Sequence, residues 1–461
     1  MSTTTKATFS IARIYDIIIY GATGFTGQRV ATYLHQTHPD IKLAIAGRNI
    51  SKLTTLAESM NLPSSHIYTA SAENRSDLVN TLSKATVVIA CAGPYRHCGE
   101  TIVSSAIEAQ THYLDLCGEP QFFDDMLAKY DRIARENKTL IISACAFDCV
   151  PAELSAKLAS KECFKKYGKV TNLEIVHTFQ NVSAGNPTTF HAAVDGFHAA
   201  ITGQLKKSRQ DVNAKLQLTP APNRPGDWPK IVSSPGTSPV YHPETNTYLL
   251  KFMGADAACI LASDRYDRYR HAQSHALAEN DLKNDSQSSP SSSPSPSLLE
   301  KDPLPRMSVC FGVDSKSAAY KILGYGAVFS TLARFQYGCK LLHGSPELFT
   351  NGMFREGGPT EEEMQKGSFE TFCTAYGMNR EEKVRVSCKG PEPGYVATPK
   401  IIVALAVCVL RHRDEVKYGN DGGVMVPGVA FGESDAVFDL LKNEGIEFKV
   451  LNEGNDSDQM V

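Results

Sequence analysis

Short apolar runs alternate with longer amphipathic segments between residues 13 and 150, and this alternation predicts a parallel sheet with crossover helices. The runs IIIY, TVVIAC and TLIISAC are almost continuously apolar, which is typical of strands covered on both faces. Strands are expected at 15–20, 42–46, 66–69, 86–91, 112–116 and 139–144, with helices at 26–35, 51–59, 76–82, 100–109 and 122–136. The pattern indicates a doubly wound, Rossmann-type α/β domain over 13–150.

From residue 151 the pattern is looser and indicates a second, mixed α/β domain over 151–394, suited to substrate binding or dimerisation. Helices are expected at 152–158 and 189–205, and strands at 172–179, 369–377 and 383–390. The stretch 219–247 is rich in Pro, Asn and Thr and holds the single tryptophan, Trp228, which indicates a long loop or flap.

A low-complexity insertion interrupts this domain at about 276–303. Its centre, SQSSPSSSPSPS at 286–297, contains only Ser, Pro and Gln and cannot bury enough apolar surface to offset the entropy of ordering. We therefore expect it to be disordered. Its Ser-Pro steps are candidates for phosphorylation, although low complexity alone also explains them.

The C-terminal segment, 395–450, is expected to return to the first domain. It contains a ten-residue apolar run at 401–410, a Gly-rich turn at 419–424 and a helix at 434–443. The apolar run falls short of the roughly 18 residues that a membrane-spanning helix needs, which favours a buried helix.

The strongest motif is the segment GATGFTG at 21–27, directly after the first strand and opening the first helix. Gly21 permits a tight turn, Gly24 lets the backbone approach a pyrophosphate, and Gly27 lets helix and strand pack closely. The phosphates would then meet free amides at the helix N-terminus. The alternative is a glycine turn needed only for packing. The remaining loop residues expected at the cofactor are Thr23, Phe25 and Thr26.

The end of the second strand distinguishes the two nicotinamide cofactors. A site for NAD usually places Asp or Glu there for the ribose 2′-hydroxyl, whereas this chain has Arg48 within AGRN. A guanidinium suits a 2′-phosphate through charge and bidentate hydrogen bonds. We therefore expect NADP(H) as the cofactor; a solvated arginine that starts a helix is the alternative.

The later strands end in CAGPY (91–95), YLDLCGE (113–119) and CAFDCVP (145–151), at the edge where doubly wound sheets bind ligands. Small residues at the first of these ends allow the nicotinamide ribose to lie against backbone. The residues expected to contact the cofactor there are Ala92, Gly93 and Pro94.

Two residues are candidates for a proton donor in hydride-transfer chemistry. Tyr95 follows the Gly-Pro turn, and its alternative role is to pack over the nicotinamide. Asp148 could act as acid or base or orient a donor, while helix capping before Pro151 is its commoner use. Asp115 and Glu119 could polarise substrate or cap the helix that follows.

No metal site is expected. His97, Cys98, Cys91 and Cys117 lack the short, regular ligand spacing of zinc sites, and buried thiols are common. The chain also has no Tyr-x-x-x-Lys motif, so a short-chain dehydrogenase mechanism has no support in the sequence.

Composition narrows the class of protein further. The 461 residues carry 47 Lys and Arg against 50 Asp and Glu, a formal net charge of -3. This balance does not indicate the basic surface that nucleic-acid binding requires. The 12 cysteines form no Cys-x-x-Cys pair and no secretory signal is evident, so reduced thiols inside a cell are expected. The Ser- and Thr-rich first 13 residues resemble a mitochondrial transit segment only weakly, and a frayed tail is the alternative.

As a set, the motifs YGATGFTG, AGR, CAGPY, THYLDLCGE and AFDCVPAEL, with GPEPGYVATP and GGVMVPGVAFG later in the chain, resemble the saccharopine dehydrogenase-like oxidoreductases. This family includes the mycobacterial trans-acting enoyl reductases of glycolipid synthesis. The resemblance implies an NADP-type domain and, from the bacterial relatives, reduction of a double bond in a lipid precursor. Eukaryotic relatives are associated with lipid droplets and mitochondria.

The combined hypothesis is an NADP(H)-dependent oxidoreductase that reduces an enoyl or carbonyl group in a small or lipid-like substrate. The alternative is a non-catalytic dinucleotide-binding protein that acts as a membrane, lipid-droplet or partner platform. The aromatic, amphipathic segment 321–342 is suited to a lipid interface, with a core helix as its alternative. Expected sites of residence are a lipid droplet or another membrane, then the mitochondrion or cytosol; a homodimer is a further expectation.

Overall fold

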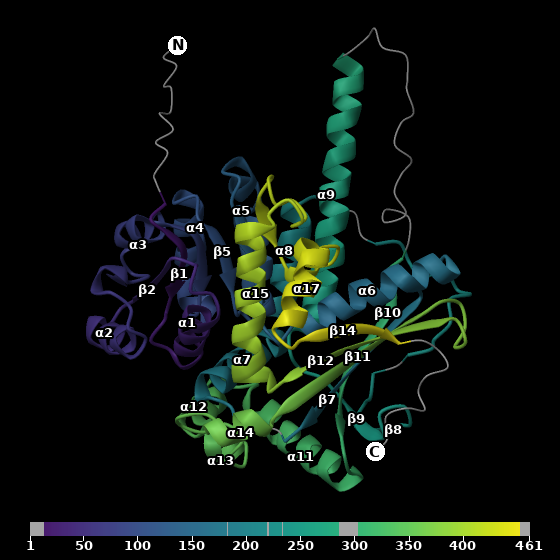
Figure 1. Ribbon diagram of the computed structural model, residues 1–461. Helices are drawn as coiled ribbons and strands as arrows, with labels where there is room; N and C mark the ends of the chain where they lie inside the picture. The colour runs from purple at the N-terminus through teal and green to yellow at the C-terminus, as the bar shows by residue number, and fades with distance from the viewer. Residues whose placement is uncertain (1–12, 182, 219–220, 233, 285–302, 452–461) are drawn as a thin grey trace.

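The computed structural model describes residues 13–181, 183–218, 221–232, 234–284 and 303–451. Two sheets form its centre (Figure 1). The first is seven-stranded and entirely parallel, in the order β13-β6-β5-β4-β1-β2-β3. This order confirms the expected doubly wound fold. Its strands are β1 (Tyr15–Tyr20), β2 (Leu43–Gly47), β3 (Ile67–Thr69), β4 (Ala85–Ala90), β5 (His112–Asp115), β6 (Leu140–Ile142) and β13 (Gly423–Met425).

Helices cover both faces of the first sheet, which is why its strands are apolar throughout. Because the crossovers are right-handed, α3, α4 and α5 lie on one face of the sheet, and α1 and α2 lie on the other. Helix α15 lies on the same face as α1 and packs against α1, β4 and β5. Ile17, Ile18 and Ile19 are all 0% exposed, so successive side chains on opposite faces are equally buried. The helices are α1 (Phe25–Thr37), α2 (Ile50–Ser59), α3 (Arg75–Leu82), α4 (Tyr95–Glu108), α5 (Pro120–Glu136) and α15 (Thr398–Arg411), with a short 3-10 turn at Ser64–His66.

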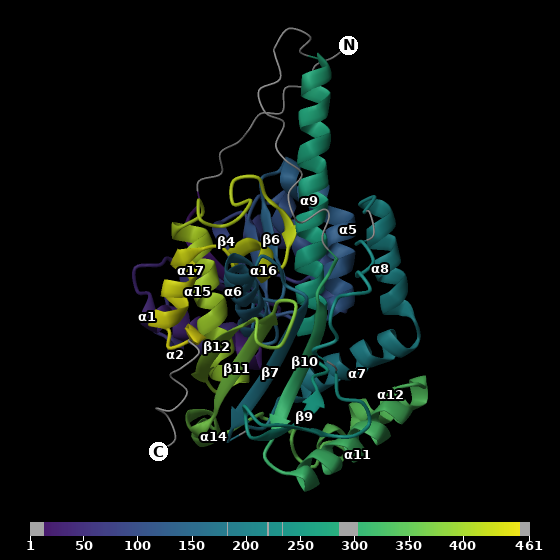
Figure 2. The same ribbon diagram turned by 90° about the vertical axis from the view of Figure 1, so that its right-hand side faces the viewer.

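The second sheet is mixed, also seven-stranded, in the order β14-β12-β11-β7-β10-β9-β8. Helix α6 (Val150–Tyr167) leads out of the first sheet and packs on one face of the second. Helix α9 (Asp256–Asn284) begins between the sheets, and its far end extends beyond the body of the protein (Figures 1 and 2). The strands are β7 (Asn172–Gln180), β8 (Val240–His242), β9 (Thr247–Lys251), β10 (Arg306–Val313), β11 (Ser368–Tyr376), β12 (Lys383–Pro391) and β14 (Glu447–Leu451).

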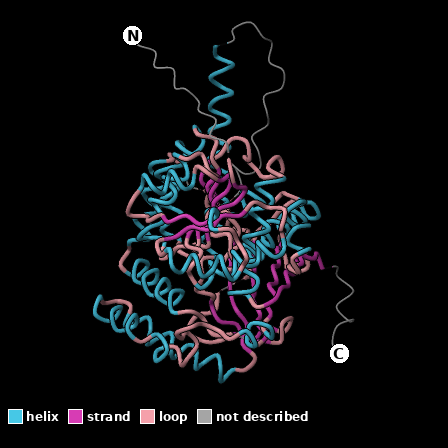
Figure 3. The backbone as a smooth tube through the Cα atoms, turned by 60° about the vertical axis from the view of Figure 1, so that its left-hand side comes forward, coloured by secondary structure: helices cyan, strands magenta, loops and turns pink. Residues whose placement is uncertain are grey.

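A group of helices lies at the opposite end from the tip of α9, around a small separate core that includes Phe190 and Leu342 (Figures 2 and 3). These helices are α7 (Pro187–Ile201), α11 (Lys316–Leu332), α12 (Gln336–Gly344) and α13 (Pro346–Phe349). The remaining helical elements are α8 (Gln204–Lys215), α14 (Glu361–Lys366), the π-helix η2 (Pro393–Ala397), α16 (Pro427–Phe431) and α17 (Asp435–Asn443).

Several expected elements differ in extent. The helix expected at 189–205 is divided into α7 and α8 because Gly203 adopts φ 80, a left-handed conformation that ends regular helix. The helix expected at 152–158 continues to Tyr167 and ends at Gly168, which is also left-handed. The segment 321–342 spans two helices, α11 and α12, rather than one.

The second half of the chain departs further from expectation. Residues 276–284 of the expected disordered insertion belong to α9, while 285–302 lie outside the described residues. The Gly-rich turn at 419–424 leads directly into β13, which pairs with β6 as the seventh strand of the first sheet. Helix α15 packs against β4 and β5, and β13 joins the first sheet, whereas the last strand, β14, pairs with β12 in the second sheet. The expected domain boundaries stay a prediction.

One continuous helical stretch, Pro393–Arg411, is long and apolar enough to cross a membrane by length and composition, within the described residues. In this fold 72% of its most apolar window is buried inside the protein. The core helices of globular proteins pass the same test, and the buried position agrees with the expectation for 401–410.

Candidate functional site

The loop between β1 and α1 requires two of its three glycines. Gly21 has φ +79, and a Cβ on it would lie 2.8 Å from the backbone nitrogen of Ala92 at the end of β4. A Cβ on Gly27 would lie 2.3 Å from the carbonyl oxygen of Gly21. Gly24 is less constrained, since its Cβ would be 3.4 Å from the same oxygen. The loop is thus held tightly between β1, β4 and α1.

Gly24 is also the N-cap of α1, and no side chain caps the helix there. The first turn of α1 carries no acidic residue, so its amides and the helix dipole are available to an anion. The ring of Phe25 packs edge-on against Tyr395 of η2, with ring centroids 4.9 Å apart. Phe25 can therefore contribute its backbone, rather than its ring, to a phosphate site.

Arg48 lies just beyond the end of β2 and is exposed. Among the described residues, it takes part in none of the ion pairs. Its charge acts on Tyr20 and Cys98, at the ends of β1 and α4, and opposes the effect of burial, which raises the pKa of both. The guanidinium therefore lies near the end of β1, where the glycine loop begins, and forms no hydrogen bond within the part of the chain that the structure describes.

The structure assigns Tyr95 a structural position. Its hydroxyl donates to Ala90 O (2.8 Å) and accepts from Leu116 N (3.1 Å), which ties the ends of β4 and β5 together. The side chain is 7% exposed, and burial, followed by the nearby Asp115 charge, raises its pKa well above the usual value. Because its one hydroxyl proton is given to a backbone carbonyl, we do not retain Tyr95 as the proton donor.

Glu119 and Asp115 likewise accept hydrogen bonds from neighbouring backbone and side-chain groups of the protein. Glu119 accepts hydrogen bonds from Tyr95 N (2.8 Å) and Arg96 Nε (2.8 Å), so it caps α4 rather than the helix that follows it. This cap explains why α4 begins at Tyr95, five residues earlier than expected. Asp115 accepts from Cys117 N and Ala144 N, both at 2.9 Å, and burial raises its pKa to about 6.

Asp148 follows β6 and is only partly buried. Its carboxyl lies between two glycines: a Cβ on Gly118 would be 3.1 Å from Asp148 Oδ2, and one on Gly254 would be 2.5 Å from Oδ1. Ala255 N donates to it at 3.1 Å. Glycine on both sides therefore leaves space for a carboxyl group at the carboxyl edge of the parallel sheet.

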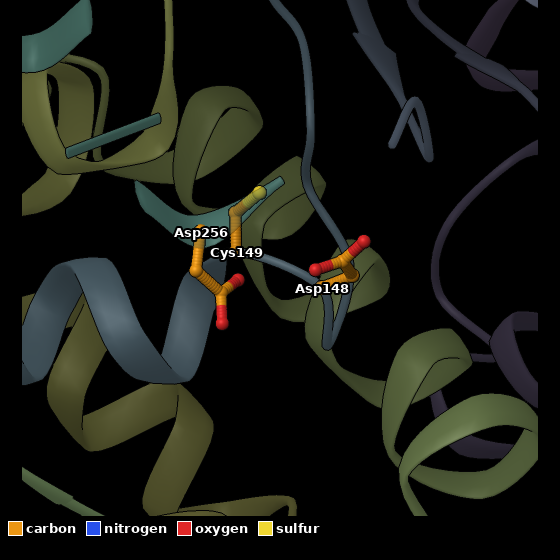
Figure 4. Close-up of side chains that lie close together, drawn as sticks. All are labelled: Asp148, Cys149 and Asp256. Carbon is orange, nitrogen blue, oxygen red and sulfur yellow. The ribbon is translucent and has the colours of Figure 1, made fainter. Parts of the chain in front are cut away.

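Two buried residues that the sequence did not single out complete this cluster. Asp256, the first residue of α9, and Cys149 each place a ligand atom within 4.8 Å of a carboxylate oxygen of Asp148 (Figure 4). Asp256 Oδ2 lies 2.7 Å from Nε2 of His177 on β7, and His177 Nδ1 lies 2.8 Å from Thr371 Oγ1 on β11. The cluster thus joins both sheets through a chain of polar side chains.

The pKa values of Asp148, Asp256 and His177 are each shifted toward the neutral form of the side chain. Burial, followed by the charge of Asp256, raises the pKa of Asp148 well above its usual value. Burial also raises the pKa of Asp256 to about 7 and lowers that of His177 to about 4. Cys149 next to Asp148 has φ 153, which L-residues rarely adopt; such strain is concentrated at functional sites.

The sequence carried one overlooked signal for this cluster. Leu173 and Ile175 of β7 share a core with residues of α6, and Phe179 packs against the core of the first sheet. Because alternate residues of a strand lie on one face, His177 occupies the same face. A histidine at a core-facing strand position needs polar partners. Asp256 has no comparable signal, because its partners come from distant parts of the chain.

The four residues considered and rejected as metal ligands are not brought together as a group. Among the described residues, the group of three or more such side chains that could hold a metal ion is Asp148, Cys149 and Asp256. Cys98 donates to Ala92 O at 3.4 Å, and His97 is exposed.

Comparisons with known proteins identify relatives over nearly the whole chain. Residues 17–142 match the family described as the saccharopine dehydrogenase NADP binding domain, which confirms NADP(H) as the cofactor. A saccharopine dehydrogenase-like oxidoreductase of Rattus norvegicus is 30% identical, over 95% of this chain and 98% of its own. A lipid droplet localized protein of Caenorhabditis elegans is 26% identical, over 95% of this chain and 99% of its own.

Two further matches bear on chemistry and fold. A Mycobacterium tuberculosis protein whose name proposes a trans-acting enoyl reductase is 30% identical over 45% of this chain and 48% of its own. The fold is similar to that of apo saccharopine dehydrogenase (L-Glu forming) from Saccharomyces cerevisiae, with TM-score 0.50, 12% identity, and coverage of 95% of this chain and 100% of that one.

Proposed function

Because this chain belongs to the saccharopine dehydrogenase-like oxidoreductase family, we propose that it is an NADP(H)-dependent reductase of an enoyl or carbonyl group in a lipid-related substrate. The partial similarity to the mycobacterial protein named for enoyl reduction supports this class of substrate. The proposed cofactor contacts are the glycine loop with Thr23, Phe25 and Thr26, the end of β4 at Ala92, Gly93 and Pro94, and Arg48.

The position of Asp148 is the observation on which the proposal depends. Asp148 lies at the carboxyl edge of the parallel sheet, beside Gly118 at the end of β5, on the edge that carries the glycine loop. NADPH, when bound, supplies a hydride. The Asp148 carboxyl, kept neutral by burial and by Asp256, then gives its proton to the substrate atom that becomes negative.

Aromatic rings next to Asp148 support an apolar substrate. Phe147 packs against Phe369 and Phe179, with ring centroids 4.7 and 5.9 Å apart, and Phe252 lies 4.7 Å from His177. Such a wall excludes water and lowers the local dielectric, so that a developing negative charge depends on the Asp148 proton. It also offers contacts to an acyl or planar unsaturated group.

The test combines binding with turnover. Fluorescence titration with NADPH and NADH is followed by an NADPH oxidation assay against a panel of enoyl thioesters and ketones. We expect Asp148→Asn to bind NADPH normally but to lose at least 100-fold in turnover, the usual scale of general acid catalysis. Asp211→Asn, an exposed change on α8, is the matched control. NADPH binding without oxidation by the wild type across the panel would support the non-catalytic platform instead.

A membrane contact is favoured by α11. Of its 17 residues only Ala319 is buried, although the helix is largely apolar. Tyr325 is 48% exposed and Val328 51%, and on α12 Tyr337 is 81% exposed. Residues 315–346 contain four cations and no Asp or Glu, which suits the surface of an anionic membrane. The cations are Lys316, Lys321, Arg334 and Lys340.

We therefore propose that α11 and α12 hold the protein at a lipid droplet or another membrane, close to its substrate. The name of the C. elegans relative supports this location. Mitochondrial and cytosolic residence are the alternatives, and fluorescence microscopy of the tagged full chain separates them. A homodimer stays a prediction, which sedimentation equilibrium tests.

A further inference from the structure

The polar chain behind Asp148 is buried and almost fully hydrogen-bonded. Thr371, His177 and Asp256 are each 0% exposed, and two hydrogen bonds of 2.8 and 2.7 Å connect them. Within this chain of three side chains, Asp256 Oδ1 is the oxygen that has no hydrogen-bond partner among the described residues. An unsatisfied buried acceptor costs free energy, so a donor is expected next to it.

The protonation of the chain follows from its geometry. A neutral imidazole carries one proton, and burial keeps His177 neutral by lowering its pKa to about 4. If the proton is on Nε2, it is donated to Asp256 Oδ2, and Nδ1 accepts the hydroxyl proton of Thr371. This arrangement satisfies every atom of the chain except Asp256 Oδ1.

The neighbour suited to that oxygen is the Asp148 carboxyl, one oxygen of which lies within 4.8 Å of an Asp256 oxygen. No Lys or Arg forms an ion pair with either carboxyl in the part of the chain that the structure describes. The other titratable groups that act on the pair are Cys149, Cys259 and Glu153, which are acidic or neutral. Two adjacent carboxyls, of which Asp256 is buried and Asp148 partly buried, retain one proton between them when no cation lies beside them.

We infer that Asp256 and His177 are positioning residues for Asp148: the buried Asp256 carboxylate, fixed by His177, shares a proton with the Asp148 carboxyl and sets its orientation. This inference rests on the proposed function, in which Asp148 gives that proton to the substrate. The O–H bond of Asp148 breaks as the new bond to the substrate forms. Asp148, the partly exposed member, then takes a proton from solvent.

Infrared difference spectroscopy tests the inference on the full chain without cofactor or substrate. The carboxylic acid C=O band that distinguishes wild type from Asp148→Asn reports the protonation of Asp148 as pH is varied. We expect this band to be present at pH 7 and its midpoint to fall by one pH unit or more, a tenfold change in the proton dissociation constant, in Asp256→Asn. Nuclear magnetic resonance of wild type should find His177 neutral with its proton on Nε2.

Each other outcome has a clear meaning. Measurements on wild type alone can overturn the inference, so it stays testable if Asp256→Asn does not fold. Either an ionised Asp148 at pH 7 or a His177 proton on Nδ1 would do so. An unchanged midpoint in folded Asp256→Asn also overturns it, as does stoichiometric Zn²⁺ binding that Asp148→Asn abolishes, because the cluster would then be a metal site. A shared proton in a chain that oxidises no NADPH would leave the pair intact and reject the reductase instead.

Discussion

The carbonyl oxygen of Gly21 occupies the space where a side chain on Gly27 would begin, 2.3 Å from the position of its Cβ. The same oxygen accepts a hydrogen bond from Gly24 N at 3.0 Å. The three glycines are therefore one unit: the turn that leaves β1 sets how closely α1 approaches it. That approach brings the N-terminus of α1 to the edge of the sheet, where the phosphates are expected.

Replacing Gly27 by Ala should separate α1 from β1. We expect Gly27→Ala to lower the free energy of unfolding by about 1–3 kcal/mol and to weaken NADPH binding, because backbone cannot yield as a side chain can. Urea denaturation and NADPH titration measure the two effects. Gly196→Ala in α7 is the control, since nothing lies within 4 Å of its Cβ. Equal stability of the two variants would contradict the steric argument.

Arg48 should determine the choice between NADPH and NADH. Loss of a charge-assisted contact of roughly 1.5–3 kcal/mol predicts that Arg48→Ala binds NADPH about 10–100-fold more weakly, with NADH binding unchanged. Fluorescence titration gives both dissociation constants. Lys52→Ala removes an exposed cation from the adjacent helix α2 and should leave the preference intact. An equal loss for both cofactors would place Arg48 away from the 2′-phosphate.

Tyr95→Phe separates a structural role from a catalytic one. The variant leaves Leu116 N without its acceptor and should lower the free energy of unfolding by about 1–3 kcal/mol. Turnover on any substrate that the panel identifies should stay within a few-fold of wild type. Thermal denaturation and the oxidation assay measure the two quantities. A loss as large as that expected of Asp148→Asn would restore Tyr95 as the proton donor.

The first sheet was predictable because its strands are buried on both faces. The apolar run Ile17–Ile19 predicts a buried strand without any knowledge of the strands that pair with it. The glycine loop follows soon after this run, at residue 21. By contrast, β13 has three residues and owes its existence to pairing with β6, far away in sequence. Its glycines, read alone, indicate a turn.

The candidate site was predictable only where sequence neighbours act together. Asp148 could be found because it follows a strand end, but its partners are the first residue of α9 and a residue in the middle of β7. Spacing rules do not relate such positions. Likewise Tyr95 stands at a strand end as a catalytic residue would, and only its hydrogen bonds to Ala90 and Leu116 reveal the structural role.

Glu153 should give the protein an alkaline instability. It is 1% exposed, and burial raises its pKa to about 7, with Asp256 adding to this and Lys157 opposing it. Because the pKa of Glu153 is higher in the folded than in the unfolded chain, its protonation contributes to the free energy of unfolding. This contribution is complete below the usual pKa of about 4.5 and is lost as pH rises through 7. Glu153→Gln should therefore be more stable than wild type at pH 9, by roughly 1–3 kcal/mol, but not at pH 5.

Urea denaturation at pH 5 and pH 9 checks the sign. The control is Glu356→Gln, an exposed change that should leave the pH dependence as in wild type. Parallel stability curves for wild type and Glu153→Gln would mean that the Glu153 carboxyl ionises as easily in the folded chain as in the unfolded one.

The exposed face of α11 should bind membranes through both apolar and charged contacts. The double variant Tyr325→Glu with Val328→Glu places carboxylates on that face, so insertion into the headgroup region should cost free energy and binding should fall at least tenfold. Flotation with phosphatidylcholine vesicles that contain phosphatidylserine measures the bound fraction. Ile50→Glu, at an equally exposed apolar position on α2 (54%), is the matched control and should bind as wild type does.

Salt separates the two contributions to this binding. Attraction between the four cations of 315–346 and anionic lipid is screened within about 8–10 Å at ordinary ionic strength, whereas burial of Tyr325 and Val328 is not. Wild-type binding should therefore weaken with added salt but persist, while Lys321→Glu with Lys340→Glu should remove most of the salt dependence. The membrane proposal would be contradicted if wild-type protein did not float with vesicles and instead sedimented as a dimer. If Val328→Glu dissociated that dimer, this face would be an interface between two copies of the chain.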